Sequence, residues 1–247
     1  MMVRWDWEIR VDPEVYSEQM GVELARLRQK AGWEEMLNEA AVELERVMRP
    51  AACWERYPVQ EIRHGRLILE NGLRLGKGFA TEQVMGGADT LIVAVLTLGS
   101  GPDRAVQEAQ RQGAYLKAML LHDLAATAVE TLRQQFCHQL EIEAGLAGRH
   151  TSATLSPGES SWPIEEQAVI FSLVDAGQIG VTLTESLVMV PVKSLSLVVG
   201  EGQRAMGEGD VEPCDYCTIQ DRCRYAKRSM RSGVPHDGTS LLRDTPA

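Results

Sequence analysis

Apolar residues recur at every third or fourth position in two parts of the chain, and this spacing predicts helices there. The first part covers residues 14–48 and the second runs from Pro102 to Glu141. Pro102 suits the first turn of a helix, and Gly113 is expected to divide the second part into two helices.

Three other stretches are typical of strands. Alternating leucines on both sides of Asn71-Gly72 predict a β-hairpin within residues 66–78. The run "DTLIVAVLTLG", residues 89–99, is continuously apolar and branched, which predicts a strand covered on both faces. Residues 181–200 are expected to form two strands around a kink at Pro191.

A short helix is expected near Trp162, after a loop of small and polar residues. Pro163 suits its first turn, and Glu165 and Glu166 would face its positive end. Its expected inner face consists of the apolar residues that recur at helical spacing, Ile164, Ala168, Phe171 and Val174.

This mixture of helices and hairpins predicts one α+β domain over residues 1–200. The composition then changes. Residues 201–213 are expected to be a linker, 214–228 contain a cysteine cluster, and 229–247 form a tail with the composition of a disordered segment.

Charge and length narrow the function classes. The 247-residue chain has a net charge of −10 and no dense basic block, which excludes nucleic acid as an expected partner. Its apolar runs are too short to span a bilayer, and its first residues lack a signal-peptide core, so no membrane association is expected. Five cysteines, an odd number, argue against a disulfide scaffold and favour a cytoplasmic protein.

Three of the five cysteines lie close together, as Cys214-x2-Cys217-x5-Cys223. The first two have the spacing at which thiolates hold one metal ion, and the third is near enough to join them. Zinc and an iron–sulfur cluster both remain open, as do three free thiols. Cys53 and Cys137 stand alone, and core positions are expected for both.

Two polar segments are candidate ligand-binding sites. In Ser156-Pro157-Gly158, proline fixes one φ angle and glycine frees the next, so backbone groups could turn toward a ligand; a plain connector is the alternative. The second segment interrupts the apolar strands around Pro191, either as a site or as a solvated face. Its polar residues are Thr184, Glu185, Ser186, Lys193 and Ser194.

Together, residues 154–200, "TLSPGESSWPIEEQAVIFSLVDAGQIGVTLTESLVMVPVKSLSLVVG", resemble the reactivation domain of cobalamin-dependent methionine synthase, and in particular its small stand-alone relatives. A weaker resemblance extends upstream to Leu67. It implies a bent antiparallel sheet flanked by helices. It also implies reductive reactivation of the cobalamin of a corrinoid-dependent methyltransferase such as methionine synthase, with S-adenosylmethionine as methyl donor and a separate protein as electron donor.

The resemblance also assigns candidate site residues. It places the ligand against the backbone of Ser156, Pro157 and Gly158 and against two strands that carry Glu185, Ser186, Pro191, Ser194 and Ser196. We therefore expect the bend after Thr154 and the segment around Pro191 to meet at a shared cleft. Trp162 is expected to form an apolar wall behind the loop, or only to fix the start of the helix.

Two positions depart from the family pattern. The family has an arginine where this chain has Thr154, and an aromatic residue where it has Glu159. A ligand carboxylate would then meet a negative charge unless Arg149, Lys193 or another cation compensates.

This departure leaves three functions open. The chain could reactivate a corrinoid protein by methyl transfer. It could be a metal- or iron–sulfur-binding redox adaptor that docks on a corrinoid protein without methyl transfer. It could also be a regulator that binds a corrinoid or nucleoside without turnover.

Overall fold

The computed structural model of the protein describes residues 1–20, 32–76, 78–159 and 162–206. Its elements follow in the order β1 (Met2–Arg4), α1 (Pro13–Met20), α3 (Trp33–Val47), β2 (Ala51–Arg63), β3 (Arg66–Leu69), β4 (Arg74–Leu75), α4 (Phe79–Met85), β5 (Thr90–Thr97), α5 (Gly101–Arg111), α6 (Tyr115–Leu146), β6 (His150–Leu155), α7 (Glu166–Leu173), the 3-10 helix η1 (Ala176–Ile179), β7 (Thr182–Leu183), β8 (Met189–Val190) and β9 (Ser194–Gly202).

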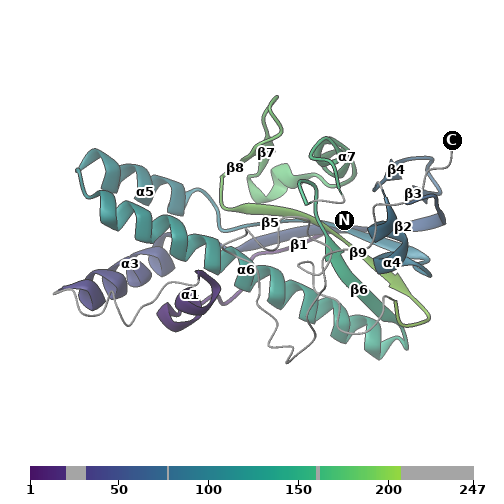
Figure 1. Ribbon diagram of the computed structural model, residues 1–247, viewed down its shortest axis with the longest axis horizontal. Coiled ribbons are helices and arrows are strands. Elements are labelled where there is room, and N and C mark those ends of the chain that lie inside the picture. Colours follow the sequence, from purple (N-terminus) through teal and green to yellow (C-terminus); the bar gives the residue numbers. More distant parts are fainter. Residues whose placement is uncertain (21–31, 77, 160–161, 207–247) are drawn as a thin grey trace, which may run out of the picture.

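A seven-stranded antiparallel sheet forms the centre of the molecule, in the order β4-β3-β2-β5-β9-β6, with β1 paired to β2 (Figure 1). The first half of β2 pairs with β1 and β5, and its second half pairs with β3 after a register shift between Val59 and Glu61. This irregularity lets one long strand serve two parts of a bent sheet. The predicted α+β class with a bent antiparallel sheet is confirmed.

Strand β5 explains why its sequence is continuously apolar. Its alternate residues Ile92, Ala94 and Leu96 belong to one core cluster, whereas Leu91 and Val93 belong to a second cluster on the other face. Both faces of the strand are therefore buried, as the apolar run predicts. The hairpin around Asn71-Gly72 is also confirmed, because Leu67 pairs with Leu75 across β3 and β4.

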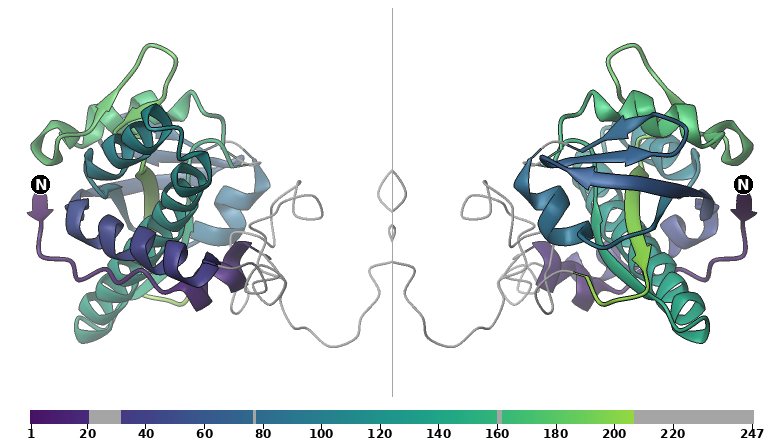
Figure 2. Two further views of the ribbon diagram at one scale, coloured as in Figure 1. Left: turned by 90° about the vertical axis from the view of Figure 1, so that its left-hand side faces the viewer. Right: turned by 90° about the vertical axis from the view of Figure 1, so that its right-hand side faces the viewer.

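Helices α1, α3, α5 and α6 cover one face of the sheet (Figures 1 and 2). Gly113, with φ of 73°, separates α5 from α6, as expected from its position. Within this layer the Phe136 ring packs edge-on against Trp7 and Trp54, with ring centroids 6.2 and 5.4 Å apart. Such aromatic contacts fix the long helix α6 against the sheet.

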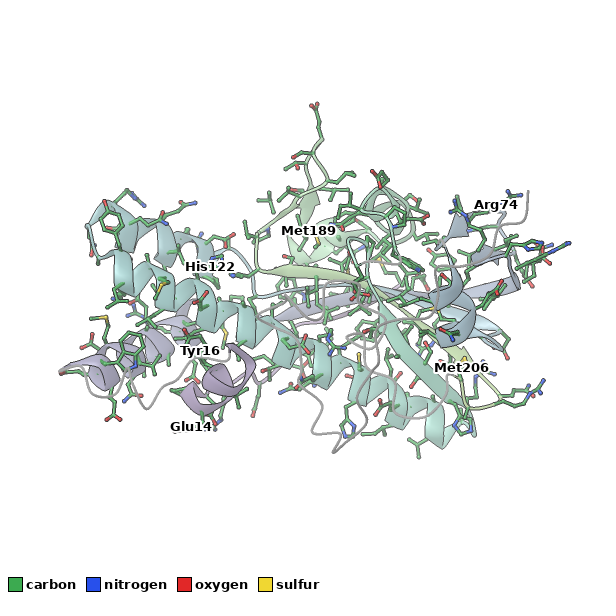
Figure 3. All side chains as sticks on the ribbon, in the orientation of Figure 1. Glu14, Tyr16, Arg74, His122, Met189 and Met206 are labelled. Carbon is green, nitrogen blue, oxygen red and sulfur yellow. The ribbon has the colours of Figure 1, made fainter. Side chains whose placement is uncertain are left out.

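The other face carries α4, α7, η1 and the β7–β8 hairpin, which extends away from the sheet (Figure 2). In Figure 3, Met189 lies at the base of this hairpin, whereas Glu14 and Tyr16 lie on the helical side. The helix that follows the candidate loop therefore belongs to the thinner layer, opposite most of the helices.

The segment 181–200 differs from the expected pair of strands. It forms the small hairpin β7–β8 and then, after Pro191, the long central strand β9. A tight turn causes the difference: the Leu187 N–H donates to the Thr184 carbonyl, and Leu187 takes a φ of 61°. Leucine rarely adopts this left-handed conformation, so the sequence gives no sign of a turn there.

Two further expectations need correction. Helix α7 begins at Glu166, and its buried residues are Glu166, Gln167, Ile170 and Leu173. Of the expected inner face, Ile164 and Ala168 are exposed and Phe171 is partly buried, whereas Val174, just after the helix, is buried as expected. The expected linker also starts too early, because β9 continues to Gly202, where Glu201 and Gly202 pair with β6.

Candidate ligand-binding site

The predicted ligand loop, which begins with Ser156-Pro157-Gly158, follows β6 at one end of the sheet. Its backbone makes a compact turn in which the Glu159 N–H donates to the Ser156 carbonyl and the Gly158 N–H donates to the Trp162 carbonyl. Gly158 is exposed and has a φ of 92°, a conformation that favours glycine. The loop is thus ordered by its own hydrogen bonds, with its glycine facing solvent.

Trp162 supports this loop from behind. Its side chain is only 1% exposed, and its indole Nε1 donates to Thr81 Oγ1 at 3.1 Å. Gly76 allows this packing, because a Cβ there would lie 2.6 Å from Thr81 Oγ1 and 3.2 Å from the Trp162 ring. Trp162 is therefore an anchor in the core, and its ring lies beyond the reach of a ligand on the surface of the loop.

Helix α7 is held at both ends. At its start the buried Glu166 carboxylate pairs with Arg66 Nη1 at 3.0 Å and accepts the Gly76 N–H at 3.2 Å. Burial raises the pKa of Glu166, which these two donors partly offset. At its end the Tyr57 hydroxyl donates to the Leu173 carbonyl at 2.5 Å. The loop is consequently followed by a helix, α7, whose two ends are both fixed by hydrogen bonds.

The predicted residues after Pro191 are internal. Ser194 Oγ lies 2.8 Å from both Thr97 Oγ1 and the Pro191 carbonyl oxygen, and Ser196 Oγ lies 3.4 Å from Gln167 Oε1. Lys193, Ser194 and Ser196 are all buried. These hydroxyl groups join β9 to β5 and to α7, so they brace the site from within.

The loop and β9 do approach each other, because Leu155 pairs with Val198 and Gln167 reaches Ser196. Glu185 and Ser186 lie elsewhere, exposed at the tip of the β7–β8 hairpin. The structure thus brings the Ser156 loop to the start of β9 but keeps the hairpin tip apart. The shared cleft stays a prediction. A hollow lined by Gln107, Gln110, Arg111 and Tyr115 lies on α5 and α6, away from this loop.

A charged cluster that the sequence did not predict lies beside the loop. Arg133 on α6 donates from Nη1 to Thr154 Oγ1 at 3.2 Å and forms a double hydrogen bond with Glu130. The Glu159 carboxylate accepts the Ser156 N–H at 3.1 Å. Burial raises the pKa of Glu159, whereas the Ser156 donor and Arg133 lower it and Glu130 raises it further.

The cations proposed to offset Glu159 are placed differently. Arg149 is bound to Asp89 and Glu201 at the other end of β6, so it does not reach the loop. Lys193 is buried just before β9. Arg133 is the guanidinium beside position 154, and its distance in sequence explains why no local motif revealed it.

The cysteine cluster Cys214, Cys217 and Cys223 lies outside the described residues. Among the residues that the structure does describe, no group of three or more histidine, cysteine or acidic side chains could hold a metal ion. In the same part of the chain, no helix has the length and apolar character needed to cross a membrane. Cys53 is buried and Cys137 half-buried, in agreement with the expected packing roles.

Comparisons with known proteins concern the fold. No family model matches the chain, and no curated protein matches it. Among solved structures, one match is the crystal structure of the MetH reactivation domain bound to AdoHcy, with a TM-score of 0.56. This chain has the MetH reactivation-domain fold. The match covers 79% of this chain and 71% of the MetH reactivation domain structure, at 19% sequence identity.

Proposed function

We propose that this protein reactivates the cobalamin of a corrinoid-dependent methyltransferase, such as methionine synthase, and that it binds S-adenosylmethionine as methyl donor. The observation that carries the proposal is the shared fold with a MetH reactivation domain whose structure contains AdoHcy. The Ser156-Pro157-Gly158 loop, which carries the sequence resemblance, is anchored at the end of the sheet beside β9, and this placement supports the proposal.

The proposed reaction has two steps. An electron from a separate donor protein reduces cob(II)alamin on the partner to cob(I)alamin. The methyl group then leaves the sulfonium of S-adenosylmethionine and bonds to the reduced cobalt, which leaves S-adenosylhomocysteine (AdoHcy). The second step makes the first one effectively irreversible, and the role of this chain is to hold the methyl donor in the required orientation.

The structure suggests a role for each proposed site residue. The backbone of Ser156, Pro157 and Gly158 would contact the ligand, with Trp162 as a fixed support behind it. Buried residues at the start of β9, Lys193 just before the strand and Ser194 within it, would keep the loop in place. Glu185 and Ser186 lie on the projecting hairpin, so we place them in the contact with the corrinoid protein.

A spectroscopic assay tests this function. The full chain is mixed anaerobically with cob(II)alamin-loaded methionine synthase lacking its own reactivation domain, a reductant and S-adenosylmethionine. The appearance of a methylcobalamin spectrum is expected, and AdoHcy in place of S-adenosylmethionine should abolish it, because AdoHcy has no methyl group to transfer. No spectral change would contradict the proposal. Tight binding without methyl transfer would instead indicate a regulator.

The spacing of Cys214, Cys217 and Cys223 supports a second candidate, a redox adaptor that docks on a corrinoid protein. Arg222, Arg224, Lys227 and Arg228 surround these cysteines in sequence, and nearby cations favour thiolates. Anaerobic purification followed by iron, sulfide and zinc analysis tests it. Iron with sulfide would support electron transfer, zinc alone would indicate a structural site, and a metal-free protein would exclude the candidate.

A further inference from the structure

In the ligand loop, the side chain of Glu159 accepts a hydrogen bond from one of the loop's own backbone N–H groups. The Ser156 N–H, which begins the turn, points to the Glu159 carboxylate at 3.1 Å. The neighbouring donors of Gly158, Glu159 and Trp162 bind backbone carbonyls within the turn. The loop therefore presents one backbone N–H to a carboxylate, and Glu159 now supplies that carboxylate.

A cation lies near the same position. Arg133 on α6 reaches Thr154, two residues before Ser156, and is held there by Glu130 on its own helix and by the buried Thr154 hydroxyl on β6. Its side chain is 17% exposed, so packing and these bonds limit its freedom. Among the groups near Glu159, Arg133 and the Ser156 donor stabilise the carboxylate, while burial and Glu130 oppose it.

The charges around Arg133 favour one further carboxylate there in addition to Glu130, but not two. Arg133 already offsets Glu130, so two further carboxylates beside it would give a strongly negative and partly desolvated cluster. A ligand that carries a carboxylate must consequently displace Glu159. The position of Glu159 makes this displacement feasible, because the residue follows the exposed Gly158 on a surface loop.

We propose that Glu159 is a built-in occupant of the carboxylate site of this loop, and that a ligand's amino-acid carboxylate replaces it there on Ser156 N–H and Arg133. The inference rests on the proposed function, because it concerns the amino-acid end of an S-adenosylmethionine-type ligand. It makes Arg133, a helix residue, the residue that determines selectivity for ligands with a carboxylate.

Two related ligands separate the amino-acid end from the nucleoside end. AdoHcy has the carboxylate, and 5′-methylthioadenosine is a similar nucleoside thioether without it. Both are titrated calorimetrically into the full-length wild type and into E159A, R133Q and E165A. Glu165 is an exposed glutamate a few residues away, so E165A is the matched control for loss of one negative charge. Thermal denaturation verifies that each variant is folded.

We expect E159A to bind AdoHcy about 10-fold more tightly than wild type, because a competing charge-assisted hydrogen bond is gone. R133Q should weaken AdoHcy binding about 10-fold or more, and both variants should leave the affinity for 5′-methylthioadenosine within about twofold. E165A should resemble wild type with both ligands.

The possible failures are distinguishable. If both ligands bind but E159A and R133Q change their affinities equally, or not at all, the inference is wrong while the proposed ligand class stands. If neither ligand binds to wild type or to E159A, the proposed S-adenosylmethionine site is wrong as well. If R133Q does not fold, R133K is measured in its place. If E159A prefers AdoHcy to 5′-methylthioadenosine by the same factor as wild type, that result alone overturns the inference.

Discussion

The anchor of the ligand loop can be tested by removing one oxygen atom. In T81V a methyl group replaces the hydroxyl that accepts the Trp162 indole N–H, and the side chain keeps its shape. Thr81 is fully buried and Trp162 nearly so, so water cannot replace the lost acceptor. A buried donor left without a partner costs about 1–3 kcal/mol in unfolding free energy.

Three other tryptophans bear on the expected size of this cost. Among the described residues, Trp7, Trp33 and Trp54 have buried indole nitrogens without a hydrogen-bond partner. The protein therefore tolerates unpaired indole donors, and we place the T81V effect in the lower half of the range, about 1–2 kcal/mol. For a domain of this size each kcal/mol lowers Tm by about 2–4 °C.

Urea denaturation followed by circular dichroism measures the effect, with W162F and the double variant completing a thermodynamic cycle. The matched control is T131V, whose hydroxyl donates only to the Thr127 carbonyl within α6, and its effect should stay within about 0.5 kcal/mol. The coupling between positions 81 and 162 should be about 1 kcal/mol. If T81V is no more destabilising than T131V, or if the coupling is zero, the hydrogen bond does not anchor the loop.

Two further predictions concern titrating groups. Burial raises the pKa of Glu159, whose charged neighbours are Arg133 and Glu130, so the folded state binds its proton more tightly than the unfolded state. The unfolding free energy of wild type relative to E159Q should therefore fall as pH rises from about 4 to about 7, and a pH-independent difference would contradict this. Burial also raises the pKa of Cys53 to about 12 and of Cys137 to about 11. At pH 8 a short iodoacetamide pulse should leave both unlabelled in the native protein and label both in guanidinium, as peptide mass spectrometry would show; rapid labelling of the native protein would refute the assignment.

Elements with a local signal could be predicted from the sequence. Strand β5 is continuously apolar because both of its faces are covered. Asn71-Gly72 marks the hairpin between β3 and β4, because these residues tolerate positive φ. The β7–β8 hairpin could not be found in this way. Its turn places Leu187 at a φ of 61°, and no glycine or asparagine in the sequence marks this turn.

The hydroxyl groups of β9 show a different limit. Ser194 and Ser196 interrupt an apolar strand, and a polar residue in that setting suggests either a ligand or a solvated face. In the structure both are buried and are matched to Thr97 and Gln167, which come from distant parts of the chain. Polarity in a strand indicates that a partner exists, but the sequence does not say whether that partner is a ligand or the protein itself.

The two departures from the family pattern are related in space. Position 154 has a threonine where the resemblance expects arginine, and position 159 has a carboxylate, so each alone suggests a lost anion site. The Thr154 hydroxyl, however, binds the guanidinium of Arg133, and that guanidinium also stabilises the Glu159 carboxylate. A positive charge can reach a loop from any element packed against it. The missing arginine in the strand therefore does not leave the loop without a cation, because the contact between α6 and β6 supplies Arg133 in its place.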